Sequence, residues 1–361
     1  MSVSPPGQAP KGRGAVSNAG SQRFAALRRE AADDGWPGEP DDADRPPATI
    51  VGEDRGPGIL TRNASPDVPF DRSINPYKGC EHGCVYCFAR PSHAYLELSP
   101  GLDFETKLVS KPDAAARLRA ALARPGYRPA TIALGANTDP YQPVERRLEI
   151  TREVLKVLAE ARHPVCIVTK SALVLRDRDL LAPLGRAGLA RVMVSITTLD
   201  RRLARRLEPR APTPARRLAA LRGLARAGVP CGVLAAPVIP ALTDSELEAI
   251  LGAAAEVGAD SAGYVLLRLP HEVRDLVAEW LAAHYPDRRD RVLAQVRDAR
   301  GGTLYDPAWG RRLTGTGPQA ALLAQRFRKA CRRLGLDTGG RDLDTGQFRP
   351  PARDDRQMSL F

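Results

Sequence analysis

Short, continuous apolar runs alternate with longer amphipathic stretches between about Asp71 and Leu336, and this alternation narrows the choice of fold further than any other feature. Apolar runs of this kind are typical of strands that are buried on both faces of a parallel sheet. The predicted strands are 130–136, 164–170, 190–197, 231–239 and 262–269, with 72–79 as a possible further strand.

Helices are expected between these strands, because the intervening stretches repeat apolar residues at helical spacing. The predicted ranges are 145–162, 213–228 and 244–258. Thr213 and Asp244 stand at N-cap positions, and Pro214 stands at a first helical position. Gly228 and Gly258 stand where helices commonly end.

Parallel strands joined by right-handed helical crossovers form either a partial or complete β/α barrel or an open doubly wound sheet, and both place chemistry at the carboxyl ends of the strands. We expect this β/α core over residues 65–300. A flexible N-terminal arm is predicted over 1–64, because the first 60 residues hold eight Pro and nine Gly. A helical C-terminal extension is predicted over 301–340 and a disordered tail over 341–361.

The chain of 361 residues carries 54 basic residues against 42 acidic ones, which gives a formal net charge of +12. Only seven of the basic residues are Lys. The excess of Arg is explained either by a GC-rich coding sequence or by a phosphate-binding face. No apolar stretch is long enough for a membrane span or a secretory signal, so we expect a cytoplasmic protein without a membrane partner.

Three of the six cysteines, Cys80, Cys84 and Cys87, form the pattern C-x3-C-x2-C. Six cysteines are too few for a disulfide framework, and a cytosolic compartment keeps thiols reduced. Three thiolates in one short loop can converge on one small inorganic centre, and Gly79 and Gly83 permit the tight turns that such a loop needs. The pattern therefore predicts a metal site.

Two kinds of centre fit three thiolates. One is a zinc ion completed by His82 or His93, which would make the chain a zinc-stabilised nucleic-acid-binding protein without redox activity. The other is an iron–sulfur cluster with one iron that lacks a protein ligand. The spacing favours the cluster, because zinc sites more often pair C-x2-C with a distant second half. Three ordinary buried cysteines are the remaining explanation.

With Tyr86 as the aromatic residue, the loop reads C-x3-C-x-aromatic-C and resembles the signature of the radical S-adenosylmethionine (SAM) superfamily, over about residues 65–300. The resemblance implies a partial (β/α)6 barrel and a 4Fe-4S cluster held by Cys80, Cys84 and Cys87. It also implies cleavage of SAM to a 5′-deoxyadenosyl radical, which abstracts hydrogen from a substrate, and a reducing electron donor such as flavodoxin or ferredoxin.

Further segments are similar to the group related to spore photoproduct lyase, which reverses a thymine dimer in DNA. These segments are 133–145, 168–171, 194–200, 207–218 and 236–244. The whole chain, with its segment "GRGAVSN", resembles an uncharacterised bacterial subgroup. The resemblance and the basic charge favour a nucleic-acid substrate, DNA or RNA, in repair or modification. A protein or small-molecule substrate is the alternative.

The resemblance also assigns cofactor contacts. Thr138 and Asp139 follow the second predicted strand, Lys170 the third and Ser195 the fourth, all at the carboxyl ends. By position, Thr138, Lys170 and Ser195 are expected to contact SAM, and Tyr86 is expected to lie beside the adenine. A cation such as Lys170 suits the carboxylate of SAM.

One position departs from the lyase pattern. The lyase carries a hydrogen-donating cysteine at the end of its second strand, and Ala136 stands at that place here. The other thiols do not fill the gap, because Cys166, Cys231 and Cys331 fall at positions typical of small buried residues. The hydrogen donor and the catalytic residues are therefore not assigned from the sequence.

An Arg-rich stretch and several polar residues have ordinary explanations. Residues 200–226 hold nine Arg and two acids, which predicts either a solvated helix face or a groove that follows phosphates. His93 and His271 are typical structural histidines, and Tyr141 and Tyr264 are explained by packing as well as by contact with a substrate.

The last five residues, QMSLF, look like the short peptide by which bacterial repair proteins and polymerases bind the sliding clamp. Gln357 would be the polar anchor, and Leu360 and Phe361 the apolar plug. The alternative is an apolar terminus that docks on its own core. The sliding clamp is thus an expected partner, beside DNA or RNA.

Overall fold

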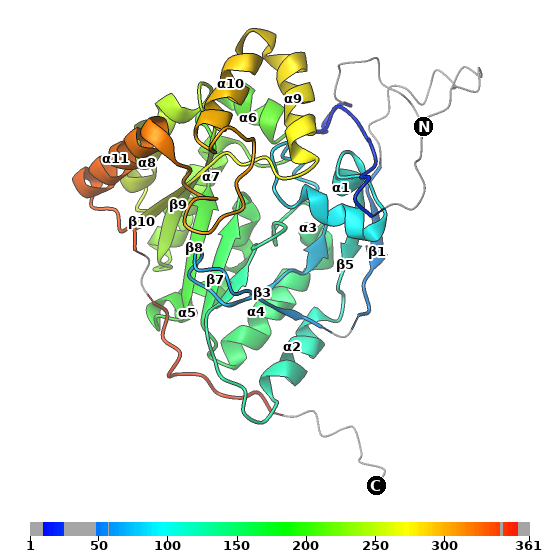
Figure 1. The fold of residues 1–361 in the computed structure, drawn as a ribbon. Helices are drawn as coiled ribbons and strands as arrows, with labels where there is room; N and C mark the ends of the chain where they lie inside the picture. Colours follow the sequence, from blue (N-terminus) through cyan, green and yellow to red (C-terminus); the bar gives the residue numbers. More distant parts are fainter. Residues whose placement is uncertain (1–9, 25–47, 57, 340–341, 353–361) are drawn as a thin grey trace.

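The computed structural model describes residues 10–24, 48–56, 58–339 and 342–352, and a seven-stranded sheet lies at its centre (Figure 1). The strand order is β10-β9-β8-β7-β6-β3-β2, and every neighbouring pair is parallel except β2 with β3. The strands are β2 Leu60–Arg62, β3 Arg72–Ile74, β6 Ile132–Leu134, β7 Val165–Thr169, β8 Ala190–Ser195, β9 Cys231–Val238 and β10 Ser261–Leu266.

The six parallel strands confirm the predicted partial (β/α)6 architecture. All five apolar runs contain a strand, and the stretch 72–79 supplies β3 and then β4, Tyr77–Lys78. Among the described residues β10 and β2 are not paired with each other, so the barrel is open rather than closed. The parallel registers bring the carboxyl ends of all six strands to one end of the sheet.

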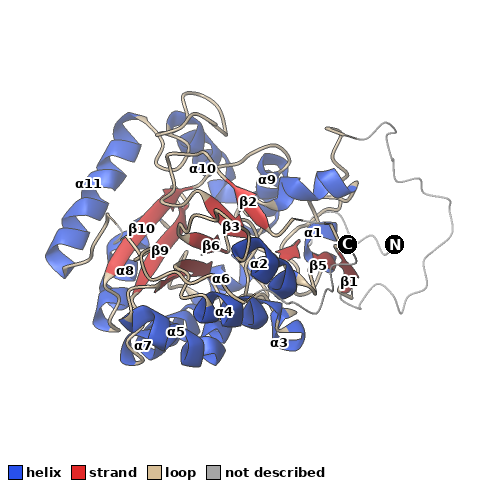
Figure 2. Cartoon of the chain, turned by 90° about the horizontal axis from the view of Figure 1, so that it is seen from below, coloured by secondary structure: helices blue, strands red, loops and turns tan. Residues whose placement is uncertain are grey.

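Helices connect the strands and cover the sheet. Figure 2 shows α4, α5 and α7 along one side of the strands and α9 and α10 on the other. The α-helices are α1 Asp103–Thr106, α2 Ala114–Leu122, α3 Glu145–Leu148, α4 Ile150–Glu160, α5 Arg178–Arg186, α6 Arg201–Leu207, α7 Pro214–Arg226, α8 Leu247–Glu256, α9 Val273–His284, α10 Pro286–Asp298 and α11 Gly317–Leu334. The 3-10 helices are η1 Arg90–Leu96, η2 Ala172–Asp177 and η3 Asp244–Glu246.

Two of the predicted helices differ from the structure, one by an interruption and the other by its first residue. The range 145–162 is interrupted at Glu149, whose φ of 52° separates α3 from α4. The buried carboxylate of Glu145 accepts a hydrogen bond of 3.0 Å from the backbone N–H of Thr151, and this contact satisfies the first turn of α4. Asp244 is not an N-cap, because it lies inside η3 and α8 begins only at Leu247.

The other predicted helix boundaries agree with the structure. Pro214 opens α7, and Thr213 occupies its N-cap position without a side-chain capping bond. Gly228 and Gly258 follow α7 and α8 with φ of 76° and 97°, which suits glycine.

The segment expected to be a flexible arm contributes strands to both sheets, because its apolar residues find partners there. β2 extends the central sheet antiparallel to β3. β1, Ile50–Glu53, pairs with β5, Lys107–Ser110, which also pairs with β4 to form a second, three-stranded sheet. Residues 10–24 lie against the body through contacts with Glu105 and Glu272.

Part of the predicted disordered tail is also bound to the body. The backbone N–H of Asp344 donates to the carbonyl of Gly188 at 3.0 Å, and that of Arg349 donates to Ala161 at 2.9 Å. The ring of Phe348 lies 5.4 Å from the rings of Tyr127 and His163. Residues Gln357, Leu360 and Phe361 lie outside the described residues.

Two apolar cores hold the layers together. The larger core lies between the central sheet and the helices around it, with α11. The second core packs Val85 and Tyr86, from the cysteine loop, against Trp280 and Leu276 of α9. The α9–α10 pair therefore covers one side of the cysteine loop. None of the described helices is long and apolar enough to cross a membrane.

Candidate active site

The loop that carries the three cysteines runs from β4 to η1 and is fixed by backbone contacts on both sides. The N–H of Cys80 donates to the carbonyl of Phe104 at 2.9 Å, and that of Val85 donates to Leu207 at 3.1 Å. Gly79 and Gly83 adopt φ of 77° and 68°, so the expected glycine turns are present.

A buried ion pair, which sequence reasoning missed, stabilises this loop from below. The guanidinium of Arg90 donates to the carbonyl of Cys84 at 2.8 Å and to that of Gly83 at 3.2 Å. It also pairs with the carboxylate of Glu105, and both side chains are fully buried. A buried Arg–carboxylate pair needs further hydrogen bonds to offset the loss of hydration, and the loop carbonyls supply them.

The N-terminal segment completes the same cluster of contacts. The backbone N–H groups of Gly14 and Ala15 each donate to the carboxylate of Glu105 at 2.9 Å. A Cβ at Gly14 would lie 1.8 Å from the carbonyl oxygen of Gly83, so only glycine fits there. The signal in the sequence was the segment "GRGAVSN", whose role was visible only once the chain was folded.

The chemistry of the three thiols fits a metal cluster. Burial is the largest cause that raises the pKa of Cys80, Cys84 and Cys87 above the ordinary value, and for Cys80 and Cys84 the neighbouring thiols add to it. Two buried thiolates and one half-buried thiolate in one loop therefore require a positive centre between them, such as a metal. Within the described ranges no three His, Cys, Asp or Glu side chains are close enough to hold a single metal ion, and a cuboidal cluster spaces its ligands more widely than zinc does.

Both histidines that could complete a zinc site have other partners. Nδ1 of His82 lies 3.3 Å from the carboxylate of Asp139. His93 is fully buried, and its Nε2 lies 2.9 Å from the carbonyl oxygen of Lys107. Its ring also packs edge-on against Phe104, at 5.1 Å between centroids. These contacts agree with the structural role expected for His93.

Lys170 brings three of the predicted SAM-contact positions together. Its ammonium donates to the hydroxyl of Ser195 at 2.7 Å and to the carbonyl of Ala236 at 3.1 Å. It also lies 5.6 Å from the centre of the Tyr86 ring. Lys170, Ser195 and Tyr86 thus form one polar cluster beside the cysteine loop, built from the ends of β7 and β8.

Glu208 is the central residue of this cluster, and sequence reasoning did not single it out. Its carboxylate is 3.2 Å from the ammonium of Lys170, accepts a hydrogen bond of 2.8 Å from Thr197, and bonds to Tyr86 and Arg217. Burial alone would raise the pKa of Glu208, but the charges of Arg217 and Lys170 outweigh it and hold the pKa well below the ordinary value. A fully charged carboxylate is therefore maintained inside the protein.

Asp139 and Thr138 bond to backbone groups beside the cluster. The carboxylate of Asp139 accepts hydrogen bonds of 2.7 Å from the hydroxyl of Thr169 and from the backbone N–H of Lys170. Thr138 donates to the carbonyl of Tyr77 at 2.7 Å. Asp139 therefore fixes the turn that carries Lys170, and Thr138 fastens its own loop to β4.

A cavity of about 520 Å³ opens beside the cysteine loop, at the carboxyl ends of β3, β6 and β10. Ala136 lines it, so a cysteine there would face the cavity. Its cationic lining residues are Lys78, Lys111, Arg268 and Arg312, and no acidic residue is among the described residues that line it. Arg268 follows β10 and makes no ion pair or hydrogen bond within the part of the chain that is described.

The remaining cysteines lie away from this cavity. Cys166 is inside β7, Cys231 opens β9 at the opposite end of the sheet, and Cys331 is buried in α11. Burial raises the pKa of Cys166 to about 11 and that of Cys231 to about 12. These unreactive thiols agree with the expected packing role.

The Arg-rich stretch is mostly a solvated face. Seven of the nine Arg between 200 and 226 are exposed, Arg206 is half-buried, and Arg217 is the buried exception. Tyr141 is fully buried and donates to Asp177 at 3.0 Å, and Tyr264 packs against Phe327, so both tyrosines belong to the core.

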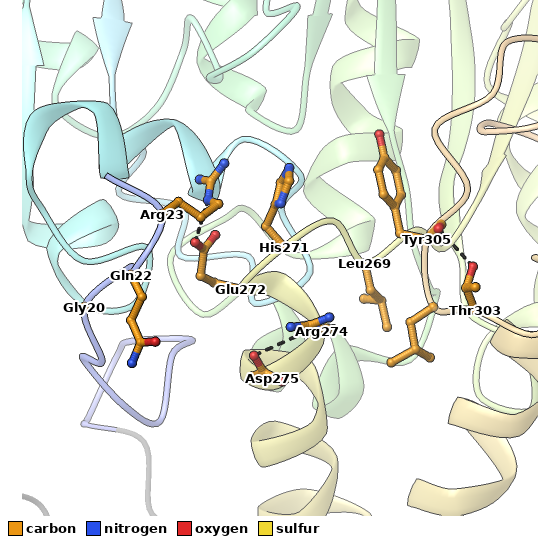
Figure 3. A pocket seen from close by; sticks show the side chains of 11 residues that line it. Gly20, Gln22, Arg23, Leu269, His271, Glu272, Arg274, Asp275, Thr303 and Tyr305 are labelled. Carbon is orange, nitrogen blue, oxygen red and sulfur yellow. Dashed lines mark hydrogen bonds and ion pairs between the residues drawn. The ribbon is translucent and has the colours of Figure 1, made fainter. Parts of the chain in front are cut away.

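His271 lies in a second cavity, of about 670 Å³, between residues 20–23, the start of α9 and residues 303–305 (Figure 3). In this cavity Arg23 pairs with Glu272 at 2.7 Å and Arg274 with Asp275 at 3.6 Å. The cations of the first cavity also have acidic partners just outside its lining, because Lys78 and Lys111 lie 2.9 and 4.0 Å from Asp54 and Arg312 pairs with Asp67. Arg268 therefore distinguishes the first cavity as a cation without an acidic partner among the described residues.

The sequence matches the family model described as the Radical SAM superfamily over residues 74–254. An uncharacterized protein of Mycobacterium tuberculosis is 42% identical over 245 residues, which cover 67% of this chain and 71% of that protein. An uncharacterized protein of Methanocaldococcus jannaschii is 30% identical over 173 residues, which cover 48% of this chain and 62% of that protein.

Solved structures of spore photoproduct lyase variants share the fold. One variant has a TM-score of 0.56 at 18% identity, with 80% of this chain and 81% of that chain covered. Another, with bound S-adenosylmethionine and a dinucleoside spore photoproduct, has a TM-score of 0.56 at 17% identity and the same coverage. At these identities the similarity concerns the fold alone.

Proposed function

Because the chain belongs to the radical SAM superfamily, we propose that it uses a 4Fe-4S cluster to cleave SAM and takes a hydrogen atom from a nucleic-acid substrate. Cys80, Cys84 and Cys87 would hold the cluster. When bound, the cluster supplies one electron, which splits the sulfonium of SAM into methionine and a 5′-deoxyadenosyl radical. The contribution of the protein is to place SAM, exclude water and present one bond of the substrate.

The polar cluster around Lys170 provides the contacts for SAM. The ammonium of Lys170 pairs with the cofactor carboxylate, and the hydroxyl of Ser195 is within reach of the same group. Tyr86 presents its ring to the adenine, with its hydroxyl fixed by Thr197 at 3.0 Å. Thr138 and Asp139 fasten the loop at the end of β6 through their bonds to the backbone of Tyr77 and Lys170.

The observation that carries the proposal is the 520 Å³ cavity beside the cysteine loop, whose described lining holds four cations and no acid. Lys78 and Lys111 pair with Asp54 and Arg312 pairs with Asp67, whereas Arg268 has no acidic partner among the described residues. Such a lining attracts an anionic substrate, and the net charge of +12 supplies the same attraction over longer range. The proposal does not include reversal of a thymine dimer by a protein thiol. Ala136 stands where the lyase has its cysteine, and no cysteine is among the described residues that line this cavity.

The test is anaerobic. The purified protein is analysed for iron and labile sulfide, then reduced with dithionite in the presence of SAM, and 5′-deoxyadenosine is measured with and without damaged DNA, undamaged DNA and RNA. About four irons per chain and 5′-deoxyadenosine that increases with one nucleic acid support the proposal. A colourless protein that contains zinc supports the nucleic-acid-binding alternative instead.

The matched variants are Cys84→Ala and Cys166→Ala. Both remove one thiol, but only Cys84 lies in the loop, so Cys84→Ala is expected to lose iron and 5′-deoxyadenosine formation while Cys166→Ala keeps both. Turnover that responds to a protein or a small molecule and not to DNA or RNA would overturn the substrate class and leave the radical chemistry standing.

A further inference from the structure

We propose that three exposed aromatic rings at the mouth of the 520 Å³ cavity stack the bases of a single-stranded nucleic acid. We call Phe24, Tyr95 and Phe88 the aromatic strip. The inference rests on the proposed function, because it names the strand form of the substrate. It goes beyond that function by assigning a binding surface that includes none of the predicted cluster ligands or SAM contacts.

The rings of the strip are unusually exposed for their size. The exposed fractions are 51% for Phe24, 71% for Tyr95 and 43% for Phe88. Phe24 and Tyr95 are stacked, with 4.7 Å between ring centroids. Tyr95 and Phe88 both line the cavity beside the cysteines. Exposed aromatic surface gathered beside a cavity indicates a binding site rather than scattered surface residues.

Cations accompany the rings. The guanidinium of Arg268 lies 4.3 Å from the centre of the Phe88 ring, and that of Arg23 lies 5.1 Å from Phe24. Arg23 is held in place by Glu272 (Figure 3). It also donates to the carbonyl of Pro91 at 2.7 Å. Arg268 has no ion pair or hydrogen bond among the described residues, so its charge is available to a phosphate.

This combination suits unpaired bases. In a duplex the faces of the bases are stacked inside, whereas single strands expose them to aromatic rings and Arg planes. The cavity also presents the side-chain amides of Asn75 and Asn137, which can bond to the edges of a base, whereas the Asn63 amide is already bonded to the backbone of Phe70 and Ser65. Rings, amides and unpaired charge together favour a single strand over a duplex.

The experiment measures binding rather than turnover. Fluorescence anisotropy is followed with anaerobically reconstituted protein and labelled 12-residue DNA and RNA strands, and with the duplex of the same sequence. We expect either single strand to bind more tightly than the duplex, and the tighter of the two identifies the sugar. We expect Tyr95→Ala to weaken single-strand binding about tenfold, since one stacked base contributes on that order. The control Leu322→Ala, which removes another large exposed apolar side chain, on α11, should bind as the parent does.

Arg268→Gln provides a second readout. In a plot of the logarithm of the affinity against the logarithm of the salt concentration, the slope should become shallower by about 0.7. This is the change expected for the loss of one phosphate contact on a single strand. Iron content and thermal unfolding of each variant confirm that it is folded. Duplex affinity equal to or above single-strand affinity, or unchanged binding in folded Tyr95→Ala, overturns the inference. Formation of 5′-deoxyadenosine by the parent protein is measured separately, so loss of the binding surface does not count against the proposed radical chemistry.

Discussion

Glu208 shows how much of the site depends on one buried charge. Its carboxylate touches Lys170, Thr197, Tyr86 and Arg217 at once, so it fixes the orientation of two predicted cofactor contacts. It does not need to contact SAM to matter, because it positions the groups that would. We therefore assign Glu208 as a positioning residue.

We expect Glu208→Gln to destabilise the protein by about 3 to 5 kcal/mol, because Arg217 would remain buried without its carboxylate. The apparent KM for SAM should rise as well, since Lys170 loses the partner that holds its ammonium. Chemical denaturation and initial rates of SAM cleavage measure the two effects. Glu256→Gln, an exposed change of the same kind on α8, is the control, and equal stability of the two variants would contradict the role.

Some candidate site residues can be predicted from the sequence. Cys80, Cys84 and Cys87 are predicted from motif spacing, and Lys170 from its place after a predicted strand together with the family resemblance. Glu208 could not, because a lone acid in an Arg-rich stretch is normally solvated, and its burial depends on how α6 and α7 fold back onto β8.

Among the elements, the turn between α4 and β7 carries a buried titratable side chain, His163. His163 is fully buried, with Nε2 2.9 Å from the hydroxyl of Tyr127 and Nδ1 3.0 Å from the carbonyl oxygen of Pro164. Burial lowers the pKa of His163 from 6.5 to about 4. The ring is therefore neutral in the folded protein at pH 5, where an unfolded chain would bind a proton.

We expect the free energy of unfolding to fall as the pH drops from 6.5 to 4, by up to about 3 kcal/mol from this residue. The sign follows from the depressed pKa, because the stabilisation is complete above 6.5 and is lost on acidification. Denaturant unfolding across this range measures it. His163→Gln should show a shallower loss than His271→Gln, which removes an exposed histidine, and parallel curves would refute the assignment.

Element types were easier to predict than their ends. The apolar runs predicted β6 to β10, because short continuous apolar runs are typical of strands that are buried on both faces of a parallel sheet. The interruption at Glu149 and the late start of α8 depend on side chains that bond to backbone groups, such as Glu145 with Thr151, and a periodic pattern does not contain that information.

At the scale of the whole molecule, the open barrel and the family were predictable, whereas the position of the N-terminal segment was not. Its composition indicates weak folding on its own, yet Gly14 and Ala15 reach Glu105 beneath the cysteine loop. The position of this segment depends on tertiary contacts, because its hydrogen-bond acceptor, Glu105, lies 90 or more positions away in the sequence.

Binding of the C-terminal peptide 357–361 to the sliding clamp remains a prediction, and it concerns how the enzyme is recruited. We expect the full chain to bind bacterial sliding clamp at micromolar concentration in a calorimetric titration. Leu360→Ala with Phe361→Ala should abolish binding, because these residues form the apolar plug. Ser359→Ala should retain it, and no heat with the parent chain would reject the idea.

Residues 344–349 run across the amino ends of β7 and β8, where Gly188 and Ala161 hold them, and the cysteine loop lies at the other pole of the sheet. The described chain therefore approaches its last described residue, 352, along the end of the sheet opposite the cysteine loop. A protein bound at this end of the sheet would leave the cysteine-loop end accessible to a substrate strand.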